Sequence, residues 1–403
     1  MAEISGVPTA DIDNVDGFFT TQGGGGGIVA DSALSGAGTM VAFSGSLNYY
    51  SAYDYTYNKR SYSTHSFVDI AASGNYLYAW AIKSDGTLWY NALENNFVST
   101  AIPNADLDGE WHQYGTDTDW TQLSAGRVVV GAIKNNEYWF IGQDAAHYQS
   151  GMGGGNNRVD WVQANNTLTW AQCALGEENT VLLTTTGEVY TCGRNREYQT
   201  GQGTTGGFTV NLTREQNTIT GVTWVAAGNQ DATIVASGQI YFTGQNSGPH
   251  AGFQSTSSSD VNGFTAVNTS ITDVVSTHHQ SRYSLLAITT NGSIRFAGYG
   301  SNRARPDNSG SSQNSATNQL DILTGAGTGW TKLFGTGSDS SGSRYAGVGI
   351  KSGDMYCGGS VFASQVQALQ NQTNTTSDWD AITNSGTPQA GAVGLTLMVV
   401  SWS

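Results

Sequence analysis

One motif recurs along this chain and constrains its fold more than any other feature. Its clearest copies open at Trp120, Trp170, Trp224 and Trp330, each with a Trp, a short apolar run and a Gly. An apolar strand, a second Gly and a Tyr-bearing strand follow, as in the run TVLLTTTGEVYTCG. Each copy therefore predicts several short strands separated by turns.

Weaker copies open at Phe67 and near Val274, and a seventh opening falls at Trp379. The steps between consecutive openings are 53, 50, 54, 50, 56 and 49 residues. A period of this size built from short strands indicates a β-propeller, in which each unit buries its apolar face only against its neighbours. No long run has a helical period. We therefore expect an all-β, seven-bladed propeller.

The seventh unit lacks its second half. After Trp379 the chain continues with AGAVGLTLMVVSWS and reaches Ser403 before the usual G-x-[LIV]-Y strand. The run VAFSGSLNYYSAY near the other end resembles that missing half. We expect the last blade to be shared between residues 41–53 and 379–403, so that an N-terminal strand closes the ring and removes its open edges. The propeller would then occupy residues 36–403, after an N-terminal segment of residues 1–35.

These repeats resemble those of the regulator of chromosome condensation family. The likeness rests on the phased Trp, apolar run and Gly, on G-x-[VI]-Y-x-x-G, and on a following G-Q-x-G. The last element is Gly201, Gln202 and Gly203, echoed by Gly151, Met152 and Gly153. The resemblance implies the propeller architecture, but it implies no activity, because propellers host unrelated functions.

Charge excludes some partners. The chain has 16 Lys and Arg against 31 Asp and Glu, a formal net charge of -15 and a pI near 4.6. Nucleic-acid binding needs clustered Lys and Arg, and the sequence offers only Arg303 and Arg305 in one loop. No apolar run approaches the roughly 20 residues of a membrane span. We expect neither a nucleic-acid partner nor membrane insertion.

Catalytic motifs are missing from the sequence. It contains no H-E-x-x-H, no G-x-S-x-G and no phosphate-binding loop, so we expect a protein that is not an enzyme. The three cysteines are expected to be small buried residues. The six histidines are expected at the surface or in loops, with the adjacent His278 and His279 pointing to opposite faces of a strand.

One acidic segment is a candidate calcium loop. Asn104-x-Asp106-x-Asp108-Gly109 matches the opening of such a loop, in which alternate oxygens converge on the ion. The twelfth position is Gly115 instead of a bidentate Glu. An ordinary Asx-rich turn is the alternative. No other cofactor is expected.

Aromatic residues raise the question of sugar binding. The tryptophans that recur in phase, including Trp379, are expected to pack between blades. Aromatics outside the phase are candidates for a surface that stacks on sugars, namely Trp111, Tyr114, Tyr148, Tyr198 and the tyrosines of residues 49–62. A sugar-degrading enzyme would also need converging carboxylates. Glu137, Glu188 and Asp354 lie at comparable points of their repeats.

The N-terminal segment carries apolar residues outside the repeats. They are Ile4, Val7, Ile12, Val15, Phe18 and Phe19, and five glycines follow at 23–27. Such a segment is too short to bury these groups alone, and the glycines form a flexible tether. It resembles the N-termini of structural proteins of bacteriophages, notably marine phages. Packing of the segment on its own propeller is the alternative.

We therefore expect a non-enzymatic virion protein, assembled in the host cytoplasm. The six apolar residues would anchor it in other virion proteins as part of a tail, fibre, appendage or capsid decoration. The propeller would then display its loops 143–158 and 302–319 for contact with proteins or with the host surface. A glycan-binding or glycan-degrading propeller is the alternative function.

Overall fold

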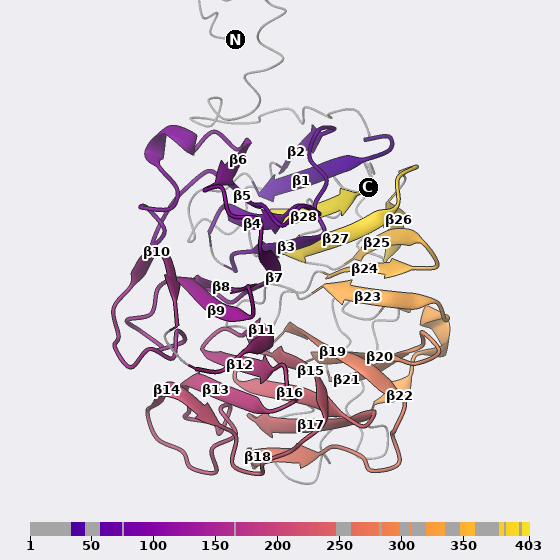
Figure 1. Cartoon of the computed structure of the whole chain (residues 1–403). Coiled ribbons are helices and arrows are strands. Elements are labelled where there is room, and N and C mark those ends of the chain that lie inside the picture. The colour runs from indigo at the N-terminus through magenta and orange to yellow at the C-terminus, as the bar shows by residue number, and fades with distance from the viewer. Residues whose placement is uncertain are drawn as a thin grey trace, which may run out of the picture.

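The computed structural model is a ring of seven four-stranded antiparallel sheets, which confirms the predicted seven-bladed propeller (Figure 1). The sheets follow one another in chain order around the molecule. The structure describes residues 34–44, 57–74, 76–164, 167–246, 259–281, 284–298, 306–307, 320–334, 347–358, 379–382, 384–394 and 397–403.

From the axis outward, the first three sheets are β3 (Asp69–Ala72), β4 (Tyr78–Ile82), β5 (Leu88–Ala92) and β6 (Trp111–Tyr114); β7 (Trp120–Ala125), β8 (Val129–Lys134), β9 (Glu137–Gly142) and β10 (Arg158–Gln163); and β11 (Trp170–Leu175), β12 (Asn179–Thr184), β13 (Val189–Arg194) and β14 (Phe208–Arg214). The next three are β15 (Val222–Ala227), β16 (Asp231–Ala236), β17 (Gln239–Gly244) and β18 (Val261–Ala266); β19 (Val274–Ser281), β20 (Ser284–Thr289), β21 (Ile294–Gly298) and β22 (Asp321–Ile322); and β23 (Trp330–Phe334), β24 (Gly347–Lys351), β25 (Asp354–Gly358) and β26 (Asp380–Ile382).

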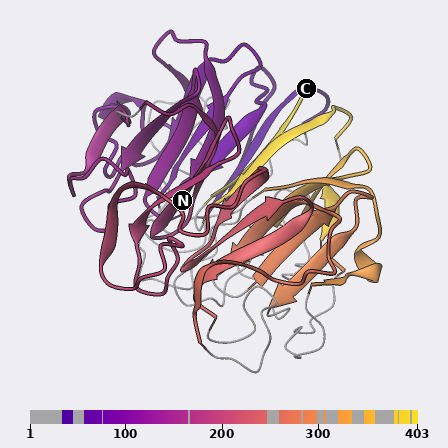
Figure 2. The same ribbon diagram turned by 60° about the horizontal axis from the view of Figure 1, so that its bottom comes forward.

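The seventh sheet joins the two ends of the chain. It contains β27 (Pro388–Val393) and β28 (Leu397–Trp402), followed by β1 (Gly38–Ser44) and β2 (Tyr57–Tyr62). Strand β1 pairs with β28 in the register Val41↔Val399, and Figure 2 shows the indigo and yellow strands side by side. Closure by an N-terminal strand is thus confirmed, and two strands rather than one come from that end. The boundary at residue 35 stays a prediction.

Two short 3-10 helices lie in loops between described strands. They are η1 (Asn104–Asp106), between β5 and β6, and η3 (Thr324–Ala326), between β22 and β23. In the part of the chain that the structure describes, no helix has the length and apolarity needed to cross a membrane.

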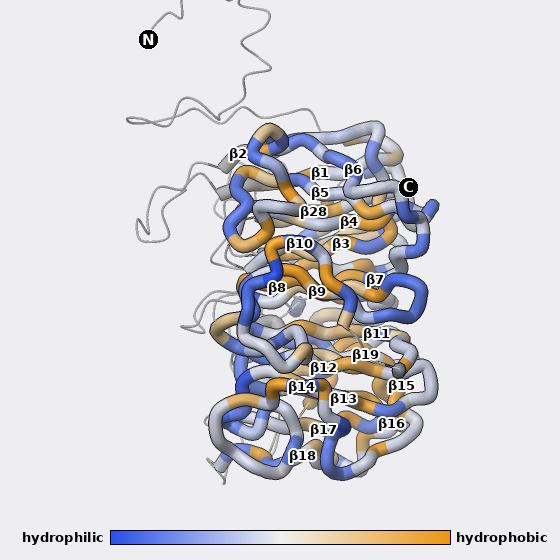
Figure 3. The backbone as a smooth tube through the Cα atoms, turned by 60° about the vertical axis from the view of Figure 1, so that its left-hand side comes forward, coloured by the Kyte–Doolittle hydropathy of each residue, from blue (hydrophilic) through white to orange (hydrophobic). Residues whose placement is uncertain are grey.

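Each sheet is buried on both faces, which explains the apolar runs of the repeat. Strands β12 and β16 bury all six of their residues. Alternate side chains of a strand point to opposite faces, so one set packs on the preceding sheet and the other on the following sheet. Seven hydrophobic clusters of described residues each combine two neighbouring sheets and so continue around the ring. Figure 3 shows hydrophilic segments mainly in the connecting loops.

The opening Trp of the repeat begins the inner strand. Trp120, Trp170 and Trp330 are at most 3% exposed. A bulge in the pairing with the second strand follows each of them. Six of the seven inner strands have this bulge, which gives them a common register, and we call the residue before it the opening residue. In the first sheet Phe67 takes the corresponding place, two residues before Asp69.

The register corrects two predictions. In the fourth sheet the bulge follows Val222, so Val222 is the opening residue and Trp224 lies two positions later, half-buried. Trp379 is buried, but it precedes β26, which pairs with β25 as the outer strand of the sixth sheet. The expectation that the seventh blade begins at Trp379 is therefore wrong. Its inner strand begins at Pro388, where the bulge recurs.

The Gly that ends the opening run lies where neighbouring inner strands meet. The amide of Glu177 donates to the carbonyl of Gly228 at 3.1 Å. A Cβ on Gly176 would lie 2.0 Å from that same carbonyl oxygen. Equivalent contacts are 2.2 Å from Gly126 to the Gly176 oxygen and 2.1 Å from Gly394 to the Ser73 oxygen. Adjacent backbones approach so closely here that a side chain does not fit.

We expect Gly176→Ala to lower the free energy of unfolding by about 2–3 kcal/mol, because the methyl group forces two backbones apart. Urea denaturation measures this change. Gly154→Ala is the matched control, since the nearest atom to its Cβ lies 3.7 Å away. Equal stability of the two variants would contradict the close approach.

Candidate functional site: the central channel

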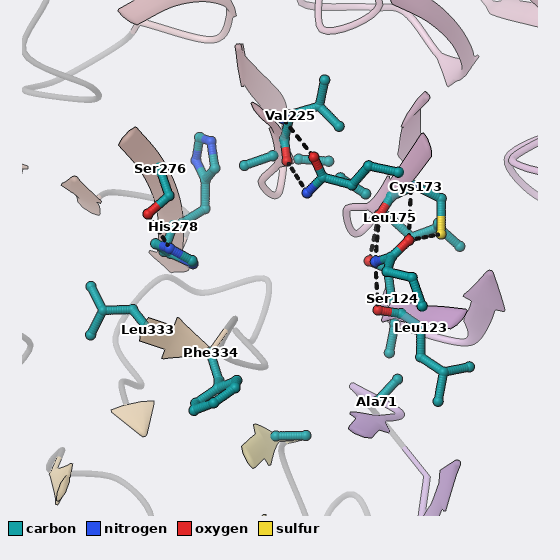
Figure 4. A pocket seen from close by; sticks show the side chains of 18 of the residues that line it. Ala71, Leu123, Ser124, Cys173, Leu175, Val225, Ser276, His278, Leu333 and Phe334 are labelled. Carbon is teal, nitrogen blue, oxygen red and sulfur yellow. Dashed lines mark hydrogen bonds between the residues drawn. The ribbon is translucent and has the colours of Figure 1, made fainter. Parts of the chain in front are cut away.

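The inner strands enclose a central channel of about 830 Å³, lined by all seven sheets (Figure 4). Many lining residues are small, including Ala71, Ala125, Ala174, Ala226 and Ala392. Small side chains leave the axis of the ring open. The channel is thus the cavity in which a ligand could be enclosed.

The two ends of the channel differ. Where the inner strands begin, the residue after the opening residue is exposed in six of the seven sheets, and these six residues are uncharged: Val68, Thr121, Ala171, Thr223, Val275 and Thr331. At the other end, neighbouring strands meet backbone to backbone at Gly126, Gly176 and Gly228. We call these ends the wide mouth and the narrow mouth.

Side chains bridge neighbouring inner strands between the two mouths. We call the second position after each opening residue the latch position, and its residues are Asp69, Gln122, Gln172, Trp224, Ser276, Lys332 and Ala390. Among the described residues, all of them except Ser276 and Ala390 bond the next inner strand. Gln122 accepts from the amide of Cys173 at 2.8 Å and donates to its carbonyl at 3.0 Å. Gln172 holds Val225 in the same way, at 3.2 Å for both bonds.

These latches provide hydrogen-bond partners for the backbone groups at the free edge of an inner strand. In an antiparallel pair, alternate residues direct their backbone N–H and C=O groups away from the partner strand. Cys173 and Val225 are such residues, and their polar groups face the channel. A buried backbone group without a partner destabilises the fold. The side-chain amides of Gln122 and Gln172 therefore stabilise the two seams that they bridge.

Other residue types latch other seams. Asp69 accepts from the amide of Leu123 at 2.6 Å and from the amide of Ile70 at 3.1 Å. The indole of Trp224 donates to the carbonyl of Thr277 at 2.9 Å. Lys332 Nζ donates to the carbonyl of Gln389 at 3.2 Å. Trp224 thus acts as a latch and not as the opening residue predicted for its blade.

Burial perturbs the ionisable groups of the channel. It raises the pKa of Asp69 to about 6, against the lowering effect of its two backbone donors and of Lys332. Burial also raises the pKa of Cys173 well above its usual range. At the narrow mouth, Arg127 pairs with the buried Glu177 at 3.2 Å. The two acidic lining residues are therefore both engaged in holding neighbouring groups.

The histidines of the fifth sheet correct a prediction. His278 and His279 are each only 8% exposed, so they are not surface residues. His278 packs on the Trp224 ring and shares a 3.1 Å hydrogen bond with Ser276. His279 faces Asp231 at 3.2 Å. Burial and the neighbouring His279 lower the pKa of His278 to about 3, so its imidazole is neutral. The three cysteines are buried and free, as predicted.

The candidate calcium residues lie in and after η1. Asn104 Oδ1 accepts from Asn95, Asp106 Oδ2 accepts from Tyr90, and Asp108 Oδ1 accepts from the Glu110 amide and contacts His112. Their oxygens thus serve different neighbours. Among the described residues no group of three or more His, Cys, Asp or Glu side chains could hold a metal ion. Calcium binding through Asn104, Asp106 and Asp108 stays a prediction.

The predicted anchor residues Ile4, Val7, Ile12, Val15, Phe18 and Phe19 lie outside the described residues, as do Arg303 and Arg305. Loop 143–158 is described, whereas of loop 302–319 only residues 306–307 are. The anchor therefore stays a prediction.

The proposed carboxylates do not line the channel. Glu188 pairs with Arg214 at 2.9 Å within its own sheet, and Glu137 accepts from the indole of Trp139. Among the aromatics, Trp111 is 5% exposed and packs on Phe67, so it is not a surface residue. Tyr148 is half-buried beside Phe208, which is 39% exposed.

Sequence reasoning missed the latches, although a signal for two of them was present. Gln122 and Gln172 each stand two residues after an opening Trp, in WTQ and WAQ. A buried inner strand has no obvious use for a long amide side chain at that position, so the repetition could have indicated an edge-capping role.

The comparisons with known proteins agree with the fold. Residues 171–199 match the family model described as "Regulator of chromosome condensation (RCC1) repeat". Human WBSCR16 is similar in structure, with a TM-score of 0.65 at 15% identity, over 91% of this chain and 99% of that one. Yeast RCC1 (Prp20) bound to Kap60 has a TM-score of 0.68 at 13% identity, over 92% and 89%.

A further structure, Prp20p from Saccharomyces cerevisiae, described with its binding properties to Gsp1p and histones, has a TM-score of 0.66 at 14% identity over 92% of each chain. No curated protein matches the sequence. Identities this low show the RCC1-like propeller fold alone.

Asp69 should make stability depend on pH. Its folded-state pKa of about 6 lies above the unfolded value of about 3.9, so the native state favours the neutral acid. Its stabilising contribution is complete below pH 4 and is lost as the pH rises through 6. We expect Asp69→Asn to gain about 2 kcal/mol relative to the parent between pH 4 and pH 7.5. Urea denaturation at both pH values tests this, and a constant difference would contradict it.

Proposed function

We propose that this protein is a non-enzymatic interaction module, in which a rigid propeller presents its loops and mouths to partner molecules. The engagement of Asp69 and Glu177 carries this proposal. Acid and base catalysis on a glycoside requires two carboxylates placed on either side of a substrate. The two that line the channel instead hold the Leu123 amide and the Arg127 guanidinium.

The solved neighbours support binding of proteins as the use of this fold. The yeast propellers are described with the protein partners Kap60, Gsp1p and histones. Those partners belong to the yeast proteins. What we transfer is the type of activity, protein binding by a closed ring, because a fold alone does not specify the partner.

The more specific role is display on a virion through the N-terminal segment. Ile4, Val7, Ile12, Val15, Phe18 and Phe19 supply apolar anchors, and the glycines at 23–27 supply a tether. The first described residues lie beside the last inner strand. Gly36 donates to Asn384 at 2.8 Å, close to the start of β27, so the chain enters the ring on the side of the wide mouth.

We expect the double variant Phe18→Ser, Phe19→Ser to fold normally and to be lost from purified particles, because serine cannot fill an apolar pocket of a partner. Quantitative mass spectrometry of particles gives the copy number. Phe208→Ser is the matched control, since it replaces an exposed Phe on the propeller. Parental copy number for the double variant would overturn the anchor.

Glycan binding is a second candidate, favoured by the ring contact of Tyr148 with Phe208 at 4.9 Å. Phe208 exposes 39% of its surface on the outer strand β14, where an aromatic face could stack on a sugar. Glycan-array binding that Phe208→Ala abolishes is the expected result for this function. Binding unaffected by that variant, or no binding at all, would exclude this site.

A further inference from the structure

Among the residues that the structure describes, no side chain latches the seam between the fifth and sixth sheets. Its latch position is Ser276, whose side chain is too short to span the gap and instead bonds His278 Nε2 at 3.1 Å. Figure 4 shows hydrogen bonds at Cys173, Leu175 and Val225 on one side of the channel. None joins the strand of Ser276 to the strand of Leu333.

Leu333 is the residue that a latch at this seam would hold. It pairs with Gly349 as Cys173 pairs with Leu182, one step from the bulge-following pair in each sheet. By this register its N–H and C=O groups face the channel. Among the described residues no side chain bonds either group. The repeat therefore indicates which two hydrogen bonds are missing and where.

The neighbouring seam is covered differently. Between the sixth and seventh sheets, Lys332 donates to the Gln389 carbonyl, and the Phe334 ring lies against Gly391. On the side of the fifth sheet, no described side chain donates to a carbonyl beside Leu333 as Lys332 does at the next seam. The seam at Ala390 also lacks a side-chain latch, but there β27 and β3 pack together and Asp69 accepts from the Ile70 amide. The seam at Ser276 differs because its two inner strands do not pack together.

The same seam is open on the channel side. Strands β19 and β23 scarcely approach each other, whereas every other pair of neighbouring inner strands packs together. Farther from the axis the seam is sealed by a cluster that includes Leu286, Phe296 and Trp330. Among the described residues, the part of the channel beside Ser276, His278 and Leu333 therefore forms a recess in its wall.

His278 forms part of this recess. It lines the channel, its side chain is more than nine-tenths buried, and its Nε2 is used by Ser276. Its Nδ1 has no hydrogen-bond partner among the described residues. This nitrogen is not fully enclosed, so a ligand in the channel can reach it. The recess thus combines a backbone N–H, a backbone C=O and a free imidazole nitrogen beside the Trp224 ring.

We propose that this recess binds a planar carboxamide, which takes the place that the side chains of Gln122 and Gln172 fill at other seams. The amide oxygen accepts from the Leu333 N–H, and the amide nitrogen donates to the Leu333 carbonyl. A carboxylate is rejected, because its second oxygen would face that carbonyl oxygen. The carboxamide belongs either to a Gln or Asn side chain of a partner protein or to a small free amide.

The test is a titration of the intact protein with two matched pairs of probes. N-acetylglutamine methylamide is compared with N-acetylglutamate methylamide, and benzamide with benzoate, while the amide resonance of Leu333 is followed by NMR. We expect saturable shifts with the carboxamides and affinity lower by roughly tenfold or more for the acids. Tighter binding of the glutamine probe identifies a protein side chain as the source, and tighter binding of benzamide identifies a small amide. No saturable shift, or equal affinity for acid and amide, overturns the proposal.

Ser276→Gln places in this seam the glutamine side chain that Gln122 and Gln172 provide at other seams. The new side chain should bond the Leu333 backbone within the same molecule, raise the melting temperature and weaken carboxamide binding by roughly tenfold or more. Thr223→Gln is the matched control, because it adds the same side chain at the wide mouth, outside the latch position. Unchanged carboxamide affinity in folded Ser276→Gln protein overturns the proposal. Should that variant not fold, the comparison of amide with acid on the parent protein still decides.

Discussion

The structure depends on how the unpaired backbone N–H and C=O groups of each inner strand find hydrogen-bond partners. A four-stranded sheet in a ring turns one edge toward the axis, where half of the backbone N–H and C=O groups have no strand to pair with. Here the neighbouring blade supplies the partners. Glutamine side chains hold Cys173 and Val225 in the body of the channel, and glycine permits direct backbone contact at the narrow mouth. These contacts join the sheets that the hydrophobic clusters bring together.

The latches also determine what the channel can do. Because Asp69 serves as a latch, the carboxyl group that burial perturbs most clearly on the channel wall is engaged with two backbone amides. Glu177, the other carboxylate of the lining, is likewise paired with Arg127. At Ser276, where the described residues provide no latch, the proposed carboxamide site uses the same backbone groups. A single arrangement thus explains both the closed seams and the open recess.

The sequence predicted the period, the blade number and closure by the N-terminal end, because these depend on local runs of apolar residues and Gly. It failed at Trp224, because the bulge after Val222 places the two side chains on opposite faces of the sheet, Val222 toward the third sheet and Trp224 toward the fifth, and no local pattern locates that bulge. It failed at Trp379 because an outer strand can also begin after a buried Trp. The channel and its recess depend on contacts between residues about fifty positions apart, such as Gln122 with Cys173, which no local pattern reports. The burial of His278 was missed for the same reason.

Amide hydrogen exchange of the native protein, resolved by residue, tests the latches most directly. We expect the amides of Cys173 and Val225 to exchange at least roughly tenfold more slowly than that of Leu333, because only the first two are held by a neighbouring blade. We also expect Gln122→Met to accelerate exchange at Cys173 and to leave exchange at Val225 unchanged. Equal protection of Cys173 and Leu333, or no response of Cys173 to Gln122→Met, would contradict the claim that side-chain latches hold the ring.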